Sequence, residues 1–128
     1  MKTILTLVCA LLPFLFACQQ KPAGFETLSV EEFRNVIDNP DVQRLDVRTT
    51  AEYTEGHIPG SLNINVLDKQ FAAMADSLLQ KSKPVALYCR SGKRSKKAAD
   101  ILSKAGYQVY ELATGFNGWQ SAGQDVEK

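Results

Sequence analysis

The run Val85–Tyr88 is the feature that most limits how this chain can fold. Its residues are all apolar or aromatic, Pro84 precedes them, and a polar stretch that contains glycine follows. A near-continuous apolar run of this length is typical of a strand buried on both faces, as in the centre of a parallel sheet. Such a strand needs helices above and below it, so the run predicts an α/β domain.

Helices and strands alternate on both sides of this run. Ser29 and Glu32 form a capping box ahead of apolar residues at helical spacing, and Thr50 is placed to cap a short second helix. The predicted helices span 29–38, a turn around 52–53, 68–79 and 95–105, and the other predicted strands span 42–47, 62–64 and 107–112. Short helices that alternate with strands imply a largely parallel sheet with helices on both faces.

Composition indicates one globular domain. The chain has 128 residues, 45% of them hydrophobic, with 15 Lys and Arg residues against 14 Asp and Glu. A chain of this length can bury a core of its own without disulfides or a metal, and the composition excludes collagen, coiled-coil and disordered classes. The net charge of +1 provides no overall basic field, so no nucleic-acid partner is expected.

The N-terminus has the pattern of an export signal. Lys2 precedes the apolar stretch 4–16, which has the length of a signal-peptide core and is too short to span a bilayer. Residues 15–18, Leu-Phe-Ala-Cys, resemble a bacterial lipobox, although Phe16 is larger than the residue usual at its position. We expect a lipoprotein signal peptide at 1–17, lipid on Cys18, a tether at 18–25 and the folded domain at 26–128.

This N-terminus predicts a protein held by its lipid on the membrane of a bacterial cell envelope, at the periplasmic or the outer surface. An uncleaved membrane anchor and plain secretion are the alternatives. With residues 1–17 removed and Cys18 acylated, Cys89 is the remaining free thiol. Exported cysteines are normally paired, so a reductant of the envelope is a candidate partner for this thiol.

Cys89 directly follows the predicted central strand, at the edge of a parallel sheet where ligands bind. The loop from Cys89 into the next helix contains Gly92, which permits a tight turn. Backbone N–H groups at a helix N-terminus attract anions, and Arg90, Lys93 and Arg94 add positive charge that favours a thiolate. The plain alternative is a solvated basic face at the start of an ordinary helix.

Segments in order along the chain resemble the rhodanese family of sulfurtransferases. The segment 89–95, Cys-Arg-Ser-Gly-Lys-Arg-Ser, is similar to the active-site loop of that family. The N-terminal signature of the family is similar to the segments 45–48, 52–53 and 56–61. Its C-terminal signature is similar to Leu112, 115–116, Trp119 and Gly123. The resemblance covers roughly residues 26–126. It departs from the family at Thr114, where a second glycine is usual, and at Asp125, where proline is common.

The resemblance implies a rhodanese-like fold with a small, mostly parallel five-stranded sheet. It also implies a thiosulfate sulfurtransferase, in which the Cys89 thiolate takes the outer sulfur of thiosulfate or a similar anionic donor as a persulfide. A thiol or cyanide acceptor then removes that sulfur. Besides Cys89, the residues expected to bind the donor are Arg90, Ser91, Gly92, Lys93, Arg94 and Ser95. Arg94 has a structural alternative as a brace of the loop.

Other polar residues are expected to order the site. Asp46 should hydrogen-bond the loops in place, and Arg48 should form an ion pair with Glu52 or Glu55. His57 is the only histidine and no ligand cluster for zinc is present, so no metal is expected. The sequence has no phosphate-binding or dinucleotide glycine pattern, so no cofactor is required.

Other functions stay open. A lipid-anchored persulfide carrier would hold the sulfur without turnover, and a binding module would carry out no chemistry. Phosphatases and arsenate reductases related to rhodaneses also begin an anion-binding loop with Cys. The phosphatase loop has five residues between Cys and Arg, whereas four separate Cys89 from Arg94, and Tyr88 stands where those enzymes commonly have His.

Overall fold

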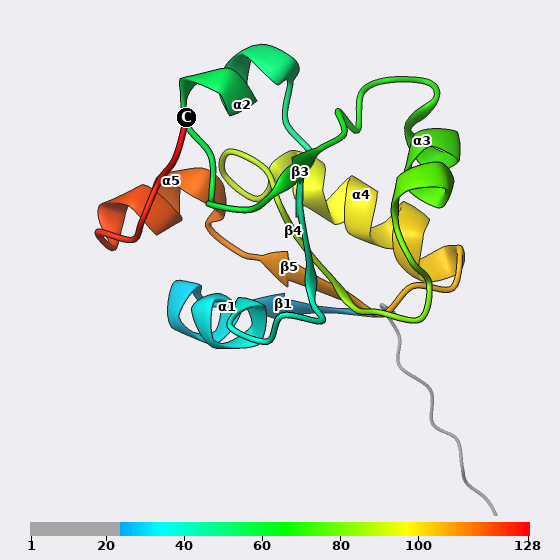
Figure 1. Ribbon diagram of the computed structural model, residues 1–128, viewed down its shortest axis with the longest axis horizontal. Coiled ribbons are helices and arrows are strands. Elements are labelled where there is room, and N and C mark those ends of the chain that lie inside the picture. The colour runs from blue at the N-terminus through cyan, green and yellow to red at the C-terminus, as the bar shows by residue number, and fades with distance from the viewer. Residues whose placement is uncertain (1–23) are drawn as a thin grey trace, which may run out of the picture.

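The computed structural model describes residues 24–128, and Figure 1 shows how their elements are arranged. A five-stranded sheet has the order β1-β5-β4-β2-β3, and each neighbouring pair is parallel. The strands are β1 (Phe25–Leu28), β2 (Gln43–Asp46), β3 (Leu62–Asn63), β4 (Val85–Tyr88) and β5 (Val109–Leu112). The apolar run singled out from the sequence is therefore the central strand of the sheet.

Helices cover both faces of this sheet. They are α1 (Val30–Ile37), α2 (Thr50–Glu55), α3 (Phe71–Leu78), α4 (Lys93–Lys104) and α5 (Gly115–Ser121). Alternate residues of β4 face opposite ways: Val85 and Leu87 pack in a cluster with α3 and α4, while Ala86 and Tyr88 pack in one with α1 and α5. The predicted α/β class and the helices on both faces are confirmed. In Figure 1, α2 lies beyond the carboxyl ends of the strands.

Burial explains why β4 reads as a continuous apolar run. Each of its residues has 0% of its surface exposed, because helices cover both faces and strands flank both edges. Full burial of one side chain such as Leu87 contributes about 1.5–3 kcal/mol to the free energy of folding. The strand that carries Cys89 at its end is thus fixed firmly in the core.

Two predicted helix starts are wrong, each for a local reason. Helix α4 begins at Lys93, before the predicted residue 95, because Gly92 at a φ of +102° turns the chain directly into the helix. Helix α3 begins at Phe71, after the predicted residue 68. Asp68 first closes a separate turn, in which its carboxylate accepts a hydrogen bond from the amide of Gln70.

The cap of α2 is also not the predicted one. The Thr49 hydroxyl accepts a hydrogen bond from the amide of Glu52, and the Glu52 carboxylate accepts one from the amide of Thr49. This is a capping box, which needs Glu three residues after the cap. Thr50 has Tyr53 in that position and lies inside the helix.

Strand β1 has no counterpart among the predicted strands. Of its residues only Leu28 is buried, so the segment lacks the apolar pattern that marks a strand. It pairs with β5 at the edge of the sheet, where Thr27 lies opposite Glu111. Because β1 begins at Phe25, the folded part of the chain includes the end of the stretch 18–25 that the sequence assigned to a tether.

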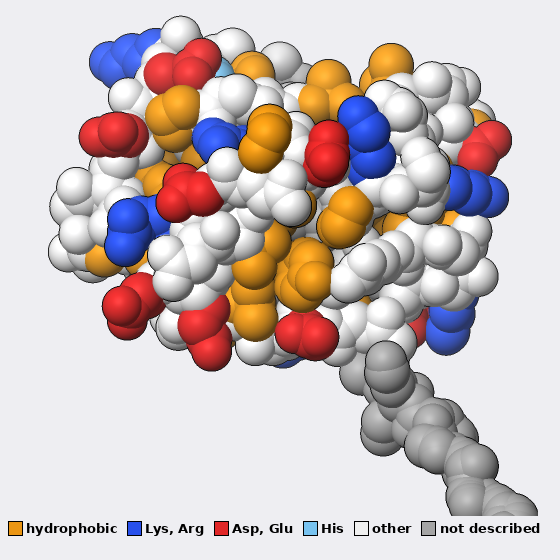
Figure 2. Space-filling model, turned by 60° about the horizontal axis from the view of Figure 1, so that its bottom comes forward, with side chains coloured by type: hydrophobic (Ala, Val, Ile, Leu, Met, Phe, Trp, Pro, Cys, Tyr) orange, Lys and Arg blue, Asp and Glu red, His pale blue; other side chains and the backbone are white. Residues whose placement is uncertain are grey.

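The surface in Figure 2 carries acidic and basic side chains scattered among apolar ones. Neither sign of charge forms a continuous field on this face. Across residues 24–128, helices fall short of the length and apolar character needed to cross a membrane.

Candidate active site

The segment 89–95 joins the centre of the sheet to α4. Cys89 leaves β4, which lies between β5 and β2, so its sulfur is at the carboxyl edge of the sheet. The turn after it requires Gly92, because a Cβ built there would overlap the carbonyl oxygen of Ala113 and because its φ is positive. The sequence thus closes a tight loop directly above the central strand.

The Cys89 sulfur is nearly enclosed, with 1% of the residue exposed. The amide of Gly92 donates to Sγ at 3.1 Å, and the Ser95 hydroxyl lies 3.4 Å from it. Burial raises the pKa of the Cys89 thiol, but its hydrogen-bond contact with the Ser95 side chain and the hydrogen bonds from loop amides outweigh burial, so the pKa lies below its ordinary value. The arrangement favours a thiolate and offers N–H groups to a negatively charged sulfur.

Helix α5 holds the loop from the opposite side. The amide of Phe116 donates to the carbonyl oxygen of Cys89 at 2.8 Å, and the amide of Asn117 donates to that of Arg90 at 2.9 Å. This approach requires Gly115, since a Cβ there would overlap the backbone of Cys89 and Arg90. The first amides of α5, which have no partner within their own helix, therefore fix the carbonyl groups of the loop.

The cationic residues of the loop are placed in two ways. Arg90 and Lys93 are exposed, as is Ser91. Arg94 instead donates from both terminal nitrogens to the Glu52 carboxylate, at 2.8 and 2.9 Å. Arg94 thus braces the loop against α2, and the charges available to an anionic ligand are those of Arg90 and Lys93.

The Arg94 pair predicts how stability depends on pH. The hydrogen bond from Arg94 holds the pKa of Glu52 at about 2, below the ordinary 4.5. Because the pKa of the Glu52 carboxyl is lower in the fold than in the unfolded chain, its ionisation stabilises the fold at pH values above the unfolded-state pKa. This stabilisation is lost as the pH falls towards about 2. Glu52→Gln should therefore lower the free energy of unfolding at neutral pH and have a much smaller effect near pH 2, as measured by urea denaturation. Glu55→Gln, at an exposed site of the same helix, is the matched control. An equal loss at both pH values would contradict the assignment.

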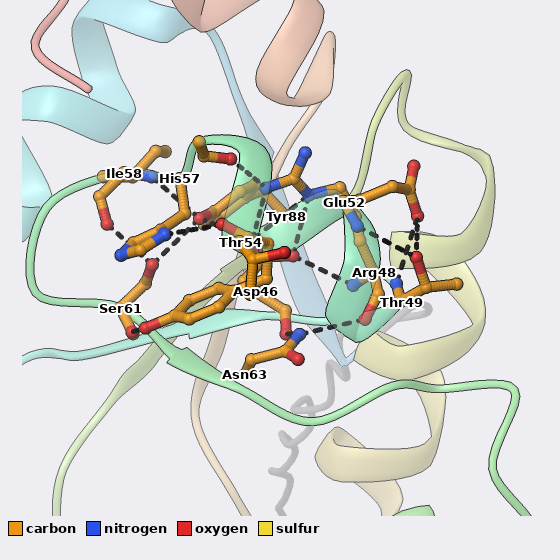
Figure 3. Close-up of polar contacts among 12 residues, drawn as sticks. Asp46, Arg48, Thr49, Glu52, Thr54, His57, Ile58, Ser61, Asn63 and Tyr88 are labelled. Atoms are coloured by element: carbon orange, nitrogen blue, oxygen red, sulfur yellow. Dashed lines mark hydrogen bonds and ion pairs between the residues drawn. The ribbon is translucent and has the colours of Figure 1, made fainter. Parts of the chain in front are cut away.

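Asp46 and Arg48 form a buried ion pair, which Figure 3 shows. The Asp46 carboxylate accepts hydrogen bonds from Arg48 Nε and Nη2 and from the Tyr88 hydroxyl, the shortest at 2.6 Å. Arg48 also donates to the carbonyl oxygen of Gly56 and lies 4.4 Å from the centre of the Phe116 ring. Burial opposes the charge, yet the Asp46 hydrogen bond keeps the pKa of Arg48 above its ordinary value.

The expected pairing of Arg48 with Glu52 or Glu55 is therefore wrong. Asp46 is the carboxylate that meets the buried guanidinium, and Glu52 is bound to Arg94. The Asp46–Arg48 pair orders the segment between β2 and the turn at Gly56.

His57 is part of a structural contact. Its ring stacks on Tyr53 at 3.7 Å, and Nδ1 lies 2.8 Å from the carbonyl oxygen of Tyr53. Its backbone pairs with Glu127 near the C-terminus. Within residues 24–128, no cluster of His, Cys, Asp and Glu has the arrangement of a metal site.

A cavity of about 200 Å³ lies beside the loop, between α2 and α5. Its lining residues are Arg48, Glu52, Glu55, Gly56, Arg90, Phe116, Asn117 and Gln120. Of the loop residues 89–95, Arg90 lines this cavity, and it directly follows Cys89, whose sulfur is buried. Polar and charged side chains therefore form most of the lining of a cavity next to the loop.

The sequence pattern does not single out Glu111, which the structure brings behind the loop. It is fully buried, and its carboxylate accepts a hydrogen bond from Ser95. The signal was a charged residue within the apolar strand 109–112. Cys18, the predicted lipid site, lies outside the described residues.

Comparison with known proteins agrees with this geometry. Residues 29–122 match the family described as Rhodanese-like domain. The chain belongs to the rhodanese-like family. This family, predicted from the loop and its flanking segments, is confirmed over most of the chain.

Several relatives of this rhodanese-like domain carry the name sulfurtransferase. The chain is 31% identical over 102 residues to thiosulfate sulfurtransferase GlpE of Pseudoalteromonas translucida, covering 77% of this chain and 92% of that protein. It is 30% identical over 116 residues to the thiosulfate:glutathione sulfurtransferase of Saccharomyces cerevisiae, covering 80% and 84%. The solution structure of a rhodanese-like domain from Anabaena superposes with a TM-score of 0.71 at 27% identity, covering 79% of this chain and 77% of that one.

The two departures from the family pattern have local explanations. Thr114 precedes α5, and its hydroxyl occupies the position that a Cβ on residue 118 would need, which Gly118 leaves free. The side chain that Thr114 has in place of the usual glycine is thus accommodated because residue 118 is a glycine. Asp125 accepts a hydrogen bond from Trp119 Nε1 through its backbone oxygen, so this contact places no demand on its side chain.

Proposed function

We propose that this rhodanese-like domain transfers a sulfane sulfur from thiosulfate, or a similar anionic donor, to a thiol or cyanide through a persulfide on Cys89. The observation that carries the proposal is the contact of a nearly enclosed Cys89 Sγ with the amide of Gly92, at 3.1 Å, in a tight loop. The names of the relatives support the same class of reaction.

The proposed reaction has two displacement steps at sulfur. The Cys89 thiolate attacks the outer sulfur of thiosulfate, a new S–S bond forms, and sulfite leaves with the electron pair of the broken bond. The terminal sulfur of the persulfide then carries the negative charge, which the loop amides stabilise. A thiolate or cyanide attacks that terminal sulfur, and Cys89 leaves as a thiolate, ready for the next cycle.

Donor binding is assigned to the exposed charges of the loop. Arg90 borders the cavity between α2 and α5, and Lys93 begins α4. Both can meet the oxyanion end of thiosulfate, whereas Arg94 is held by Glu52. Ser91 and the N–H groups around Gly92 complete the donor site, and Ser95 lies against the sulfur itself.

The loop is less suited to phosphoryl transfer. Four residues separate Cys89 from Arg94, and the Arg94 guanidinium is already bound at both terminal nitrogens. Bidentate recognition of phosphate oxygens by an arginine uses two of its N–H groups at once, and those of Arg94 are occupied by Glu52. The geometry therefore favours a single sulfur atom over a tetrahedral phosphate.

Intact-mass measurement tests the function directly. Incubation with thiosulfate alone should add the mass of one sulfur, and cyanide or a small thiol should then remove it with release of thiocyanate or a persulfide. Sulfur uptake without removal by acceptors would indicate a persulfide carrier. No uptake together with hydrolysis of aryl phosphates would replace the proposal with a phosphatase, and neither activity would indicate a binding module.

We also propose that the domain is anchored to the membrane of a bacterial envelope by lipid on Cys18. The lipobox-like sequence and the short apolar stretch before it support this. Expressed with its full N-terminus, the protein should fractionate with membranes, and Cys18→Ala should block processing and leave a longer chain. Cys9→Ala, within the signal peptide, is the matched control. Identical processing of Cys18→Ala and the parent, with no lipid-bearing N-terminal peptide by mass spectrometry, would contradict the anchor.

A further inference from the structure

A fully buried carboxylate stands behind the nucleophile. Glu111 lies in β5 with 0% of its surface exposed. Its Oε2 accepts a hydrogen bond from the Ser95 hydroxyl at 2.5 Å, and its Oε1 accepts one from Thr27 at 2.9 Å. Lys96 approaches both oxygens at 3.3 and 3.4 Å. A buried charged residue in a central part of a sheet is costly, so its contacts call for an explanation.

Ser95 connects this carboxylate to the nucleophile. Its Oγ lies 3.4 Å from Cys89 Sγ and 2.5 Å from Glu111 Oε2. A hydroxyl has one proton to donate. When that proton points at Glu111, Ser95 presents only lone pairs to the sulfur, which suits a neutral thiol that donates its own proton. A thiolate instead needs the Ser95 proton, so Glu111 and the sulfur compete for it.

We propose that Glu111 is a positioning residue that controls the ionisation of Cys89 by competing for the Ser95 proton. A carboxylate accepts a hydrogen bond more strongly than a neutral group does. Glu111 therefore favours states in which Sγ is uncharged, namely the thiol and the persulfide, whose charge is on the terminal sulfur. The thiolate between them is made less stable and hence more reactive toward a donor.

This role deepens the proposed function, and it depends on that function only for its effect on turnover. The ionisation of Cys89 is a property of the thiol itself, which can be measured with a neutral alkylating reagent. A domain that failed to transfer sulfur could still show the effect of Glu111 on its thiol. The two proposals therefore fail separately.

Other charged groups lie on the elements that surround Cys89. From α4 these are Lys96, which contacts Glu111, and Arg94, which Glu52 neutralises. From β2, the charge of Asp46 is paired with Arg48. The other titratable groups nearby are Arg90 and Lys93 in the loop and Tyr88 in β4, and none of these three residues is replaced in the variants that test the proposal.

The test is the rate of Cys89 alkylation by iodoacetamide as a function of pH, read on the Cys89 peptide by mass spectrometry in the full chain. Glu111→Gln keeps the shape and a neutral acceptor for Ser95, so the midpoint should fall and the rate below it should rise by about threefold to tenfold. Ser95→Ala removes the donor, so the midpoint should rise. Ser95→Thr, which keeps the hydroxyl, should restore the parent profile.

The double variant distinguishes action through Ser95 from action through space. In the presence of Ser95→Ala, Glu111→Gln should shift the midpoint by less than half as much as it does alone. An equal shift in both backgrounds, or no shift from Glu111→Gln, would overturn the proposal. Asp100→Asn removes a carboxylate that pairs with Lys104 elsewhere on α4 and should leave the profile unchanged. An equal shift from Asp100→Asn would also overturn it.

Lys96→Met provides a second route if Glu111→Gln does not fold. The Lys96 side chain is 55% exposed, so its replacement leaves the core intact. Without this cation, Glu111 should hold the Ser95 proton more strongly, and the alkylation midpoint should rise. That rise should shrink when Ser95→Ala is also present. An unchanged midpoint, or an equal rise in both backgrounds, would count against the proposal.

Discussion

Replacement of Cys89 with serine is expected to abolish sulfur uptake from thiosulfate. A hydroxyl at this position stays protonated at neutral pH and is a far weaker nucleophile toward sulfur than a thiolate. Sulfur transfer should fall on the order of a thousandfold or more, to the background of the uncatalysed reaction. The measurements are thiocyanate release and intact mass after incubation with thiosulfate.

The serine variant should keep its fold, which separates loss of chemistry from loss of structure. The oxygen is smaller than sulfur, and the Gly92 amide that donates to Sγ can donate to a hydroxyl as well. We expect the free energy of unfolding to change by less than about 1 kcal/mol. Cys18→Ala is the control for the thiol count and should retain sulfur uptake. A serine variant that still gains the mass of one sulfur would place the chemistry at another residue.

The central strand of this fold could be predicted because the pattern that marks it lies within a few consecutive residues. The run Val85–Tyr88 is apolar throughout since helices cover both of its faces. The loop that follows is constrained by Gly92 and by the helix it enters, both of which are visible in the sequence. The edge strand β1 could not be predicted in the same way, because only Leu28 among its residues is buried.

The polar contacts around the site depend on tertiary structure, and the sequence predicts them less well. Spacing along the chain favours an ion pair between Arg48 and a carboxylate of α2, as on an exposed surface. In the fold the guanidinium turns inward and stacks on Phe116, where Asp46 is the carboxylate within reach. The position of Glu111 could not be predicted because it depends on strand register, which places it beside Thr27, and on the packing of Ser95 in α4.

Removal of the Asp46 carboxylate is expected to be the most destabilising single change near the site. Asp46 is fully buried, and Arg48 is 3% exposed. In Asp46→Ala the guanidinium would remain in the core with Gly56 as its acceptor but without its counter-ion. Breaking a buried pair in this way costs about 3–5 kcal/mol, a large part of the roughly 5–15 kcal/mol that stabilises a typical domain. Urea denaturation measures the loss, and Glu55→Ala, exposed on α2, should change stability by about 0.5 kcal/mol or less.

A second replacement tests whether the unpaired charge is the cause. Arg48→Met removes the guanidinium and leaves an unbranched side chain to pack against Phe116, so the buried charge that Asp46→Ala leaves unpaired no longer exists. The variant with both replacements should therefore be more stable than Asp46→Ala alone, although it carries one more change. This outcome follows because breaking a buried ion pair is costly mainly through the charge that remains without a partner, and only secondarily through the removed attraction. If the two losses of stability simply added, Asp46 and Arg48 would contribute independently, and the cluster in Figure 3 would owe its stability to packing.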